Sequence, residues 1–229
     1  MEKIPTLFRR GEDHKIYDQV AKDCGGVSAG RGYATVKIDG TACRLHGGIL
    51  FKRLTLKPTK KGLQRMKSFY MEDGIKRPYI LRLQDYDAPK SWMPAPASAD
   101  PVTGKWPGWV MIDAEAPEDR WYREGWEHRV SLEGLLIPNQ TYELVGPKVQ
   151  GNPYGLQVHT LVPHGIEMHG VPTDFEGLRG WLFVNEVEGV VWHWPRPKGT
   201  RYAKIKRRDF GLDWPLEGRF APLPPGYVP

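Results

Sequence analysis

Glycine and proline recur at short intervals along the whole chain, and they limit how far any helix or strand can run. The 229 residues include 26 glycines and 21 prolines, with no internal repeat and no low-complexity segment. Both residue types mark turns and weaken the interiors of regular elements. The chain is therefore expected to form many short strands joined by turns. Its length fits one large domain or two small ones.

Short stretches rich in β-branched and aromatic residues predict the strands. One helix is predicted over residues 173–185, where Thr173 and Glu176 have the spacing of a capping box. Together these patterns predict an α+β fold with mainly antiparallel sheets and flanking helices, in a single domain over residues 1–229. The later strands are predicted at 141–146, 156–162, 187–194 and 202–208.

Two segments without periodicity are assigned to the surface. Residues 85–109 are rich in proline, glycine and alanine, and they contain tryptophans that would be costly to expose. We interpret this run as a long ordered surface loop rather than a linker. The proline-rich tail, from about residue 215 to 229, is also expected to lie along the surface.

Charge, cysteine content and hydropathy restrict the compartment and the partners. The net charge of +6 is compatible with a polyanionic partner but does not require one. Two cysteines, Cys24 and Cys43, are too few for a disulfide framework, which favours a reducing compartment. No apolar run approaches the roughly 20 residues of a membrane span, and the N-terminus lacks the apolar core of a signal peptide. We predict a cytoplasmic protein, with a nuclear location left open, and a monomer.

The stretch "YATVKIDGTACRLHGGILFKRL" places a lysine between two strands. Lys37 ends an alternating apolar run, and Asp39 and Gly40 follow it as a turn before the next β-rich stretch. A lysine acts as a nucleophile only when it is deprotonated, which desolvation or neighbouring cations favour. Taken alone, this lysine would be an ordinary solvated residue of a hairpin.

Four further charged residues in predicted strands could form a nucleotide-binding site together with Lys37. Lys204 and Lys206 point to one side of their predicted strand because side chains alternate along it, so both can supply cations and phosphate ligands. Glu143 and Glu188 open apolar strand stretches. Their carboxylates suit a ribose hydroxyl and a hard cation such as Mg²⁺.

The ordered motifs K-I-D-G, Y-E-L-V-G, V-E-G-V-V-W and K-I-K resemble the covalent nucleotidyltransferase superfamily of polynucleotide ligases and mRNA capping enzymes. The segments "QGNPYGL", "LVPHG", "EGVVWH" and "FGLDWP" resemble more closely the 5′-phosphate-to-3′-hydroxyl RNA ligases of vertebrates and their microbial and viral relatives. The resemblance extends from about Ile4 to Pro215. It implies an adenylyltransferase domain of the ligase type, and the short tail predicts that no OB-fold follows.

The resemblance implies a role for each matching residue. Lys37 would attack the α-phosphorus of ATP, and Lys204 and Lys206 would bind the α-phosphate as further catalytic residues. Arg53 would bind ribose or phosphates, including the 5′-phosphate of the RNA. The remaining implied nucleotide ligands are Asp39, Gly40, Glu143 and Glu188.

The implied cofactors are ATP and Mg²⁺ or Mn²⁺, with Glu188 and Asp39 on the metal. Pro163 or His164 would occupy the place where the superfamily stacks an aromatic ring on the base. Arg207 and Arg208, which extend the basic run, are candidate contacts to the RNA backbone. The implied substrate is RNA with a 5′-phosphate and a 3′-hydroxyl end.

Two other classes of function stay open. One is a nucleotidyltransferase that is not a ligase, such as an RNA guanylyltransferase or a protein AMP-transferring enzyme. The other is a non-catalytic RNA-binding module that retains the fold. The complete set of lysines and glutamates argues against a pure binder, because binding alone does not require a lysine nucleophile.

Overall fold

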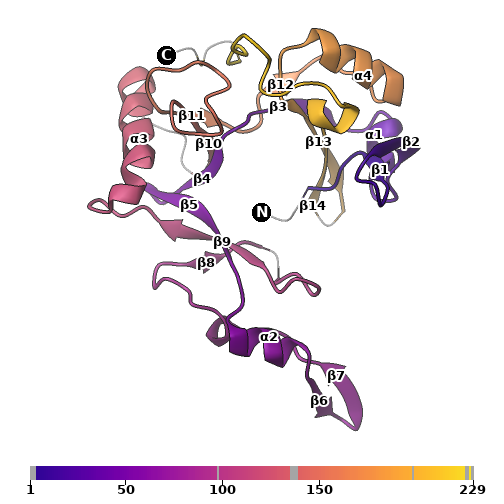
Figure 1. The fold of residues 1–229 in the computed structure, drawn as a ribbon, viewed down its shortest axis with the longest axis vertical. Helices are drawn as coiled ribbons and strands as arrows, with labels where there is room; N and C mark the ends of the chain where they lie inside the picture. Colours follow the sequence, from indigo (N-terminus) through magenta and orange to yellow (C-terminus); the bar gives the residue numbers. More distant parts are fainter. Residues whose placement is uncertain (1–3, 97, 135–138, 198, 225–226, 228–229) are drawn as a thin grey trace.

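Two antiparallel sheets form the body of the molecule (Figure 1). The computed structural model describes residues 4–96, 98–134, 139–197, 199–224 and 227. The four-stranded sheet has the order β12 (Glu167–Met168), β3 (Tyr33–Lys37), β13 (Gly189–Arg196) and β14 (Gly199–Lys206). The six-stranded sheet has the order β11 (Thr160–Pro163), β10 (Thr141–Val145), β4 (Thr41–His46), β5 (Ile49–Leu56), β9 (Trp106–Met111) and β8 (Met93–Pro94).

Helix α4 (Phe175–Val184) covers one face of the four-stranded sheet. Its Leu178 and Leu182 are fully buried in a core with the alternate residues of β13 and β14 that point to this side. The predicted helix is confirmed, but its predicted cap is wrong. The side chain of Asp174, not Thr173, accepts the capping hydrogen bond, from the backbone N–H of Gly177 at 2.7 Å. Asp174 is extended, so its carboxylate reaches the free N–H groups of the first turn.

Helix α3 (Arg120–Glu133) packs on the six-stranded sheet and was not predicted. Tyr122, Trp126 and Val130 recur every four residues and lie against a core that includes Tyr142 and Leu144. Glycine and many charged residues interrupt the apolar pattern of this helix, and its first turn follows the short η2 (Pro117–Asp119). The two sheets thus each carry a helix.

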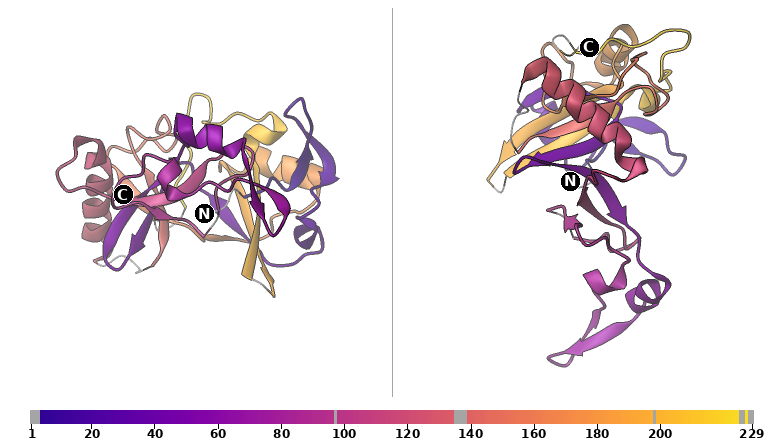
Figure 2. Two further views of the ribbon diagram at one scale, coloured as in Figure 1. Left: turned by 90° about the horizontal axis from the view of Figure 1, so that it is seen from below. Right: turned by 90° about the vertical axis from the view of Figure 1, so that its left-hand side faces the viewer.

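A long projection leaves the six-stranded sheet between β5 and β9 (Figures 1 and 2). We call residues 57–82 the arm. It contains α2 (Lys60–Met66) and a hairpin of β6 (Phe69–Glu72) and β7 (Ile75–Pro78), and it joins the body through η1 (Leu83–Asp85). The arm extends away from the four-stranded sheet along the longest axis of the molecule. The strands that precede and follow this projection, β5 and β9, pair directly with each other, with Leu56 opposite Trp106.

The remaining elements surround the four-stranded sheet. A hairpin of β1 (Phe8–Arg10) and β2 (Ile16–Val20) is followed by α1 (Gly25–Ser28) beside β13. After β14 the chain turns into η3 (Arg207–Phe210). Among the described residues, no helix is both long enough and apolar enough to cross a membrane.

Several predicted strands are confirmed and others need correction. The predictions at 141–146 and 187–194 match β10 and β13, although β13 begins only after Glu188. The prediction at 156–162 is wrong in its first half, because the strand β11 begins at Thr160. Residues 207 and 208 belong to η3 rather than to the predicted strand.

The two segments assigned to the surface contribute more than predicted. Within 85–109, Tyr86 and Trp92 are buried, and the last part is strand β9 rather than loop. In the tail, Leu216, Ala221 and Leu223 are buried in a core with Val36 and Val162. This segment therefore contributes to the core as well as to the surface. Residues 225, 226, 228 and 229 of the predicted tail lie outside the described residues.

Candidate active site

The K-I-D-G motif forms the crossing between the two sheets. Lys37 is the last residue of β3, and Thr41 is the first residue of β4. Gly40 lies so close to β10 that a Cβ atom there would be 2.4 Å from the carbonyl oxygen of Leu144 and 3.0 Å from Cβ of Glu143. A side chain at this position would therefore displace the crossing. The prediction that Lys37 stands between two strands is confirmed, and the two strands belong to different sheets.

Lys37, Glu188, Lys204 and Lys206 form one cluster, which we call the lysine centre. Lys37 Nζ lies 2.5 Å from Oε2 of Glu188, and Lys206 Nζ lies 2.7 Å from Oε1 of the same carboxylate. The sheet register explains this geometry, since Gly189 pairs with Lys37 on one side and with Lys206 on the other. Glu188 is only 3% exposed. A buried carboxylate thus holds two ammonium groups from β3 and β14, the two strands that flank β13.

Lys204 lies one step further along the same face of β14. Lys204 pairs with Val191, and Lys206 pairs with Gly189. Because the two lysines are two residues apart on one strand, this register confirms that they share a face. Burial lowers the pKa of Lys204, and repulsion from Lys206 and Lys37 adds to this effect, against a smaller attraction from Glu188. The centre therefore holds three cations against one buried carboxylate, an arrangement that favours the binding of an anion.

Asp39 is oriented by two aromatic residues that the sequence analysis did not assign. The indole Nε1–H of Trp214 donates to Oδ2 of Asp39 at 2.8 Å, and the backbone N–H of Asp39 donates to the hydroxyl of Tyr154 at 2.8 Å. Burial raises the pKa of Tyr154 and outweighs the hydrogen bond from Asp39, which lowers it, while the nearby carboxylates Glu188, Asp39 and Glu143 raise it further. Tyr154 therefore stays a neutral hydroxyl amid three carboxylates. The segments "QGNPYGL" and "FGLDWP", which carry the resemblance to RNA ligases, contain these two residues, but no role was predicted for either.

Glu143 pairs with a histidine at the edge of the six-stranded sheet. His164 Nε2 lies 3.0 Å from Oε1 of Glu143, and His164 Nδ1 lies 2.9 Å from Oγ1 of Thr141. The other oxygen of Glu143, Oε2, is buried with no hydrogen-bond partner within the part of the chain that the structure describes. An unsatisfied buried carboxylate oxygen is costly, and a ribose hydroxyl would satisfy it. Pro163 is buried in β11, which leaves His164 as the more accessible of the two residues predicted at the base-stacking position.

Arg53 and Lys52 point to opposite faces of β5. Lys52 pairs with Cys43 in the ladder and forms an ion pair with Asp119 at the start of α3. Arg53 is exposed, and alternation places it on the face opposite to Lys52. Glu143 shares that face, because it pairs with Ala42, which precedes Cys43. The structure thus puts Arg53 and Glu143 on one side of the six-stranded sheet.

The carboxylates predicted to bind a metal do not form a complete site by themselves. Both oxygens of Glu188 contact ammonium groups, and one oxygen of Asp39 contacts Trp214. No group of three or more histidine, cysteine, aspartate or glutamate side chains suited to a metal ion occurs among the described residues. Mg²⁺ is often held by one or two carboxylates together with substrate phosphates. A shared site of this kind on Glu188 and Asp39 stays a prediction.

Arg207 does not face a ligand. It is buried, and its guanidinium donates to the carbonyl oxygens of Leu182, Asn185 and Asp213. The prediction of an RNA contact at Arg207 is therefore wrong, since this side chain ties the end of α4 to η3. Arg208 is exposed, and it donates to the carbonyl oxygen of Trp214.

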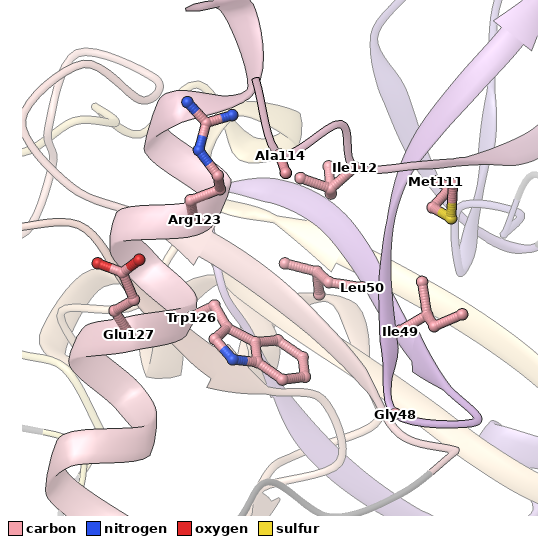
Figure 3. A pocket seen from close by; sticks show the side chains of 9 residues that line it. All are labelled: Gly48, Ile49, Leu50, Met111, Ile112, Ala114, Arg123, Trp126 and Glu127. Carbon is pink, nitrogen blue, oxygen red and sulfur yellow. The ribbon is translucent and has the colours of Figure 1, made fainter. Parts of the chain in front are cut away.

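An apolar hollow of about 350 Å³ lies beside α3 (Figure 3). Trp126 points from the helix toward Ile49 and Leu50, while Arg123 and Glu127 stand along the same helix at the rim. None of the predicted site residues lines this hollow.

Comparison with known proteins decides the family. A family model for RNA ligase 1 matches residues 128–225, which include Glu143, Glu188, Lys204 and Lys206. RNA ligase 1 of Danio rerio is 31% identical over 229 aligned positions, covering 82% of this chain and 70% of that protein. This chain belongs to the RNA ligase 1 family. RNA ligase 1 of Pongo abelii is 30% identical, covering 80% of this chain and 68% of that protein. RNA ligase 1 of Rattus norvegicus is 29% identical, covering 92% of this chain and 73% of that protein.

Family membership confirms the resemblance seen in the sequence motifs. The lysine centre includes residues from inside and outside the region that the family model matches. Lys37 precedes that region, whereas Glu188 and Lys206 lie within it. The structure brings Lys37, Glu188, Lys204 and Lys206 together, and Asp39 follows Lys37 by two residues at the crossing. The roles of these residues in catalysis stay predictions.

Proposed function

We propose that this chain is an ATP-dependent RNA ligase that joins a 5′-phosphate to a 3′-hydroxyl end, on a nucleotidyltransferase domain of the ligase type. The observation that carries the proposal is the contact of Lys37 and Lys206 with one buried carboxylate, Glu188. Membership in the RNA ligase 1 family supports the choice of RNA as the substrate. The proposal covers a cytoplasmic, monomeric enzyme.

Three transfers make up the proposed reaction. Lys37 Nζ attacks the α-phosphorus of ATP, so that an N–P bond forms, the bond to the β-phosphate breaks and pyrophosphate leaves. An oxygen of the RNA 5′-phosphate then attacks the lysyl-AMP phosphorus, which releases Lys37 and leaves AMP on the RNA end. The 3′-hydroxyl finally attacks the activated 5′-phosphate, which forms the phosphodiester and releases AMP.

The side chains of the site match the demands of this chemistry. Phosphoryl-type transfer depends mainly on positioning and on neutralisation of charge. Glu188 orients Lys37 and lies within reach of its proton, while Lys204 and Lys206 are placed to neutralise the α-phosphate. The buried, unsatisfied oxygen of Glu143 suits a ribose hydroxyl.

Mg²⁺ or Mn²⁺ would be held by Glu188 and Asp39 together with the phosphates, and it would neutralise negative charge on the triphosphate. Before the nucleotide binds, these residues hold the lysines and the crossing in place. Tyr154 and Trp214 keep the backbone and carboxylate of Asp39 oriented throughout.

A two-stage assay tests the proposal. Purified protein is incubated with labelled ATP or GTP, and the protein is then offered 5′-phosphorylated RNA or matched DNA. We expect one AMP on the protein from ATP, and sealing of RNA well above that of DNA, since the 2′-hydroxyl distinguishes the two. Labelling from GTP, or labelling without any sealing, would instead support a guanylyltransferase or a protein AMP-transferring enzyme.

A further inference from the structure

The arm holds the whole net positive charge of the chain. Residues 57–82 contain eight lysines and arginines but only two acidic residues. The rest of the chain has 25 basic and 25 acidic residues and is electrically balanced. A net charge of +6 on a single projecting segment produces a strong local positive potential, which favours a polyanionic partner.

Much of this charge is not neutralised within the arm. Arg77 pairs with Glu72, and Arg65 pairs with Asp85 at the base of the arm. Lys60, Lys61 and Lys67, in and just after α2, have no carboxylate within ion-pair distance among the described residues. These three ammonium groups lie in solvent, where they can approach phosphates.

The hairpin of the arm exposes aromatic and apolar side chains next to these cations. Every residue of β6 and β7 is exposed. Phe69 is 57% exposed, and the Lys76 ammonium lies 4.4 Å from the centre of its ring. Exposed rings interleaved with cations are typical of surfaces that bind single-stranded nucleic acids, where bases stack on the rings.

A hollow of about 560 Å³ lies between α2, the hairpin and the segment that leads from β7 into η1. This volume falls in the roughly 300–1,000 Å³ range of sites for small molecules. Two arginines provide charge, two tyrosines provide ring faces, and a glutamine provides an amide that can read a base edge. The lining residues are Arg65, Tyr70, Tyr79, Ile80, Arg82 and Gln84.

A buried carboxylate holds one wall of this hollow in place. Asp85 is 1% exposed, and it accepts hydrogen bonds from Arg65 at 2.7 Å and from the Tyr79 hydroxyl at 3.1 Å. Burial would raise the pKa of Asp85, but hydrogen bonds from the backbone N–H of Arg82, from Arg65 and from Tyr79 outweigh it and lower the pKa. Asp85 is therefore charged at neutral pH, and the guanidinium and the phenol are fixed before any ligand binds.

We propose that the arm is an RNA-binding element, with the cations of α2 on the phosphates and an unpaired nucleotide in the hollow beside Tyr70. The proposal rests on the proposed function for the identity of the nucleic acid. Because the arm extends away from the four-stranded sheet that carries the lysine centre (Figure 1), it contacts a part of the RNA strand remote from the end being joined. It therefore acts on affinity for RNA and not on the transfer of AMP to Lys37.

The test compares two triple variants of the full chain. The arm variant carries K60Q, K61Q and K67Q. The control carries R9Q, K15Q and K22Q, which remove three charges from exposed positions in and around the β1–β2 hairpin, well away from the arm. Binding is measured by fluorescence anisotropy with labelled single-stranded RNA that carries a 5′-phosphate. Self-adenylation with ATP is measured in parallel.

We expect the arm variant to bind RNA about tenfold more weakly at about 0.15 M salt, with a salt slope reduced by about 2. The control variant should keep the parent affinity, and both variants should adenylate at the parent rate. Equal binding by the two variants would overturn the proposal, as would a parent chain that does not bind RNA. A parent that binds RNA through the arm but never seals it would contradict the proposed function and leave the arm assignment standing.

Variants at Tyr70 test the hollow separately. Y70A should weaken RNA binding about tenfold and Y70F should restore it, because stacking needs the ring and not the hydroxyl. Y17A, at an exposed tyrosine of β2, is the matched control. If phosphatidylserine vesicles bind the parent but not the arm variant while RNA affinity is unchanged, the arm belongs to a membrane surface and the RNA assignment is wrong.

Discussion

The lysine centre and the arm both gather cations, but they differ in how these cations are neutralised. In the lysine centre, buried Glu188 directly precedes β13 and contacts two ammonium groups, and the lysines lie on the two strands that flank β13. In the arm, the lysines of α2 lie in solvent on a projecting segment. Compensated and partly buried charges are suited to position a reacting phosphate, whereas exposed charges supply affinity that depends strongly on salt.

The largest effect is expected from a substitution that disrupts the lysine centre and leaves the arm intact. K37A should abolish self-adenylation, with a loss well beyond the roughly 10²-fold typical of one removed electrostatic contact, because no nucleophile remains. Intact-mass measurement after incubation with ATP and Mg²⁺ detects the AMP adduct. Binding of RNA by K37A should stay at the parent level. A K37A protein that still acquires AMP would refute the assignment of the nucleophile.

Salt should separate the two regions more gradually. If about four phosphates of a single strand are neutralised, RNA binding should fall about 50-fold between about 50 and 200 mM salt. Self-adenylation should change far less, because its charges are held at short range and are partly buried. RNA affinity and the rate of self-adenylation are measured across a salt series on the same preparation. Parallel declines would contradict the division of roles.

A matched pair of glycine variants probes the crossing between the sheets. G40A should destabilise the protein by about 1–3 kcal/mol, because its Cβ would clash with the backbone of β10. Self-adenylation should fall about tenfold in consequence. G180A, on the exposed side of α4 with open space around it, should raise stability by about 0.5–1 kcal/mol. Urea unfolding measures both, and a neutral G40A would show that the crossing adapts.

The smallest expected effect concerns Lys204 and pH. Its pKa is lowered from the model-compound value of 10.5 by burial and by Lys206 and Lys37. Between the folded-state pKa and 10.5 the unfolded chain binds more protons, so this group makes stability rise with pH in that window. K204M should remove this rise and be more stable than the parent at neutral pH, while it loses self-adenylation. Unfolding at several alkaline pH values would show the difference, and identical pH profiles for both proteins would contradict it.

Short motifs predicted the site better than they predicted the fold around it. The turn after Lys37 and the common face of Lys204 and Lys206 follow from local spacing, and the structure confirms both. The ion pairs of Glu188 depend on three strands that meet only in the folded sheet, so no single motif reveals them. Helix α3 escaped notice because charged residues and Gly125 dilute its apolar stripe.

The residues that orient Asp39 were hidden for a different reason. Tyr154 and Trp214 come from loops far along the chain, and each reaches Asp39 with one polar atom. Their segments were recognised only as part of the resemblance to RNA ligases, and spacing along the chain does not show which distant side chains meet Asp39. The arm was not predicted either, because its side chains are mostly exposed. Hydrophobic patterning carries little information about side chains that face water.

The position of the arm in the ladder has a consequence for how this family can diversify. Leu56 and Trp106 face each other in adjoining antiparallel strands, so residues 57–105 begin and end at one rung of the sheet, and β8, within them, pairs with β9. Lengthening, trimming or exchanging the arm, residues 57–82, leaves the register of β5 and β9 unchanged. Under the proposed role of the arm, a change in this one segment would alter RNA affinity without any realignment of β3, which carries Lys37. Grafting the arm from one relative onto another would test this separation directly.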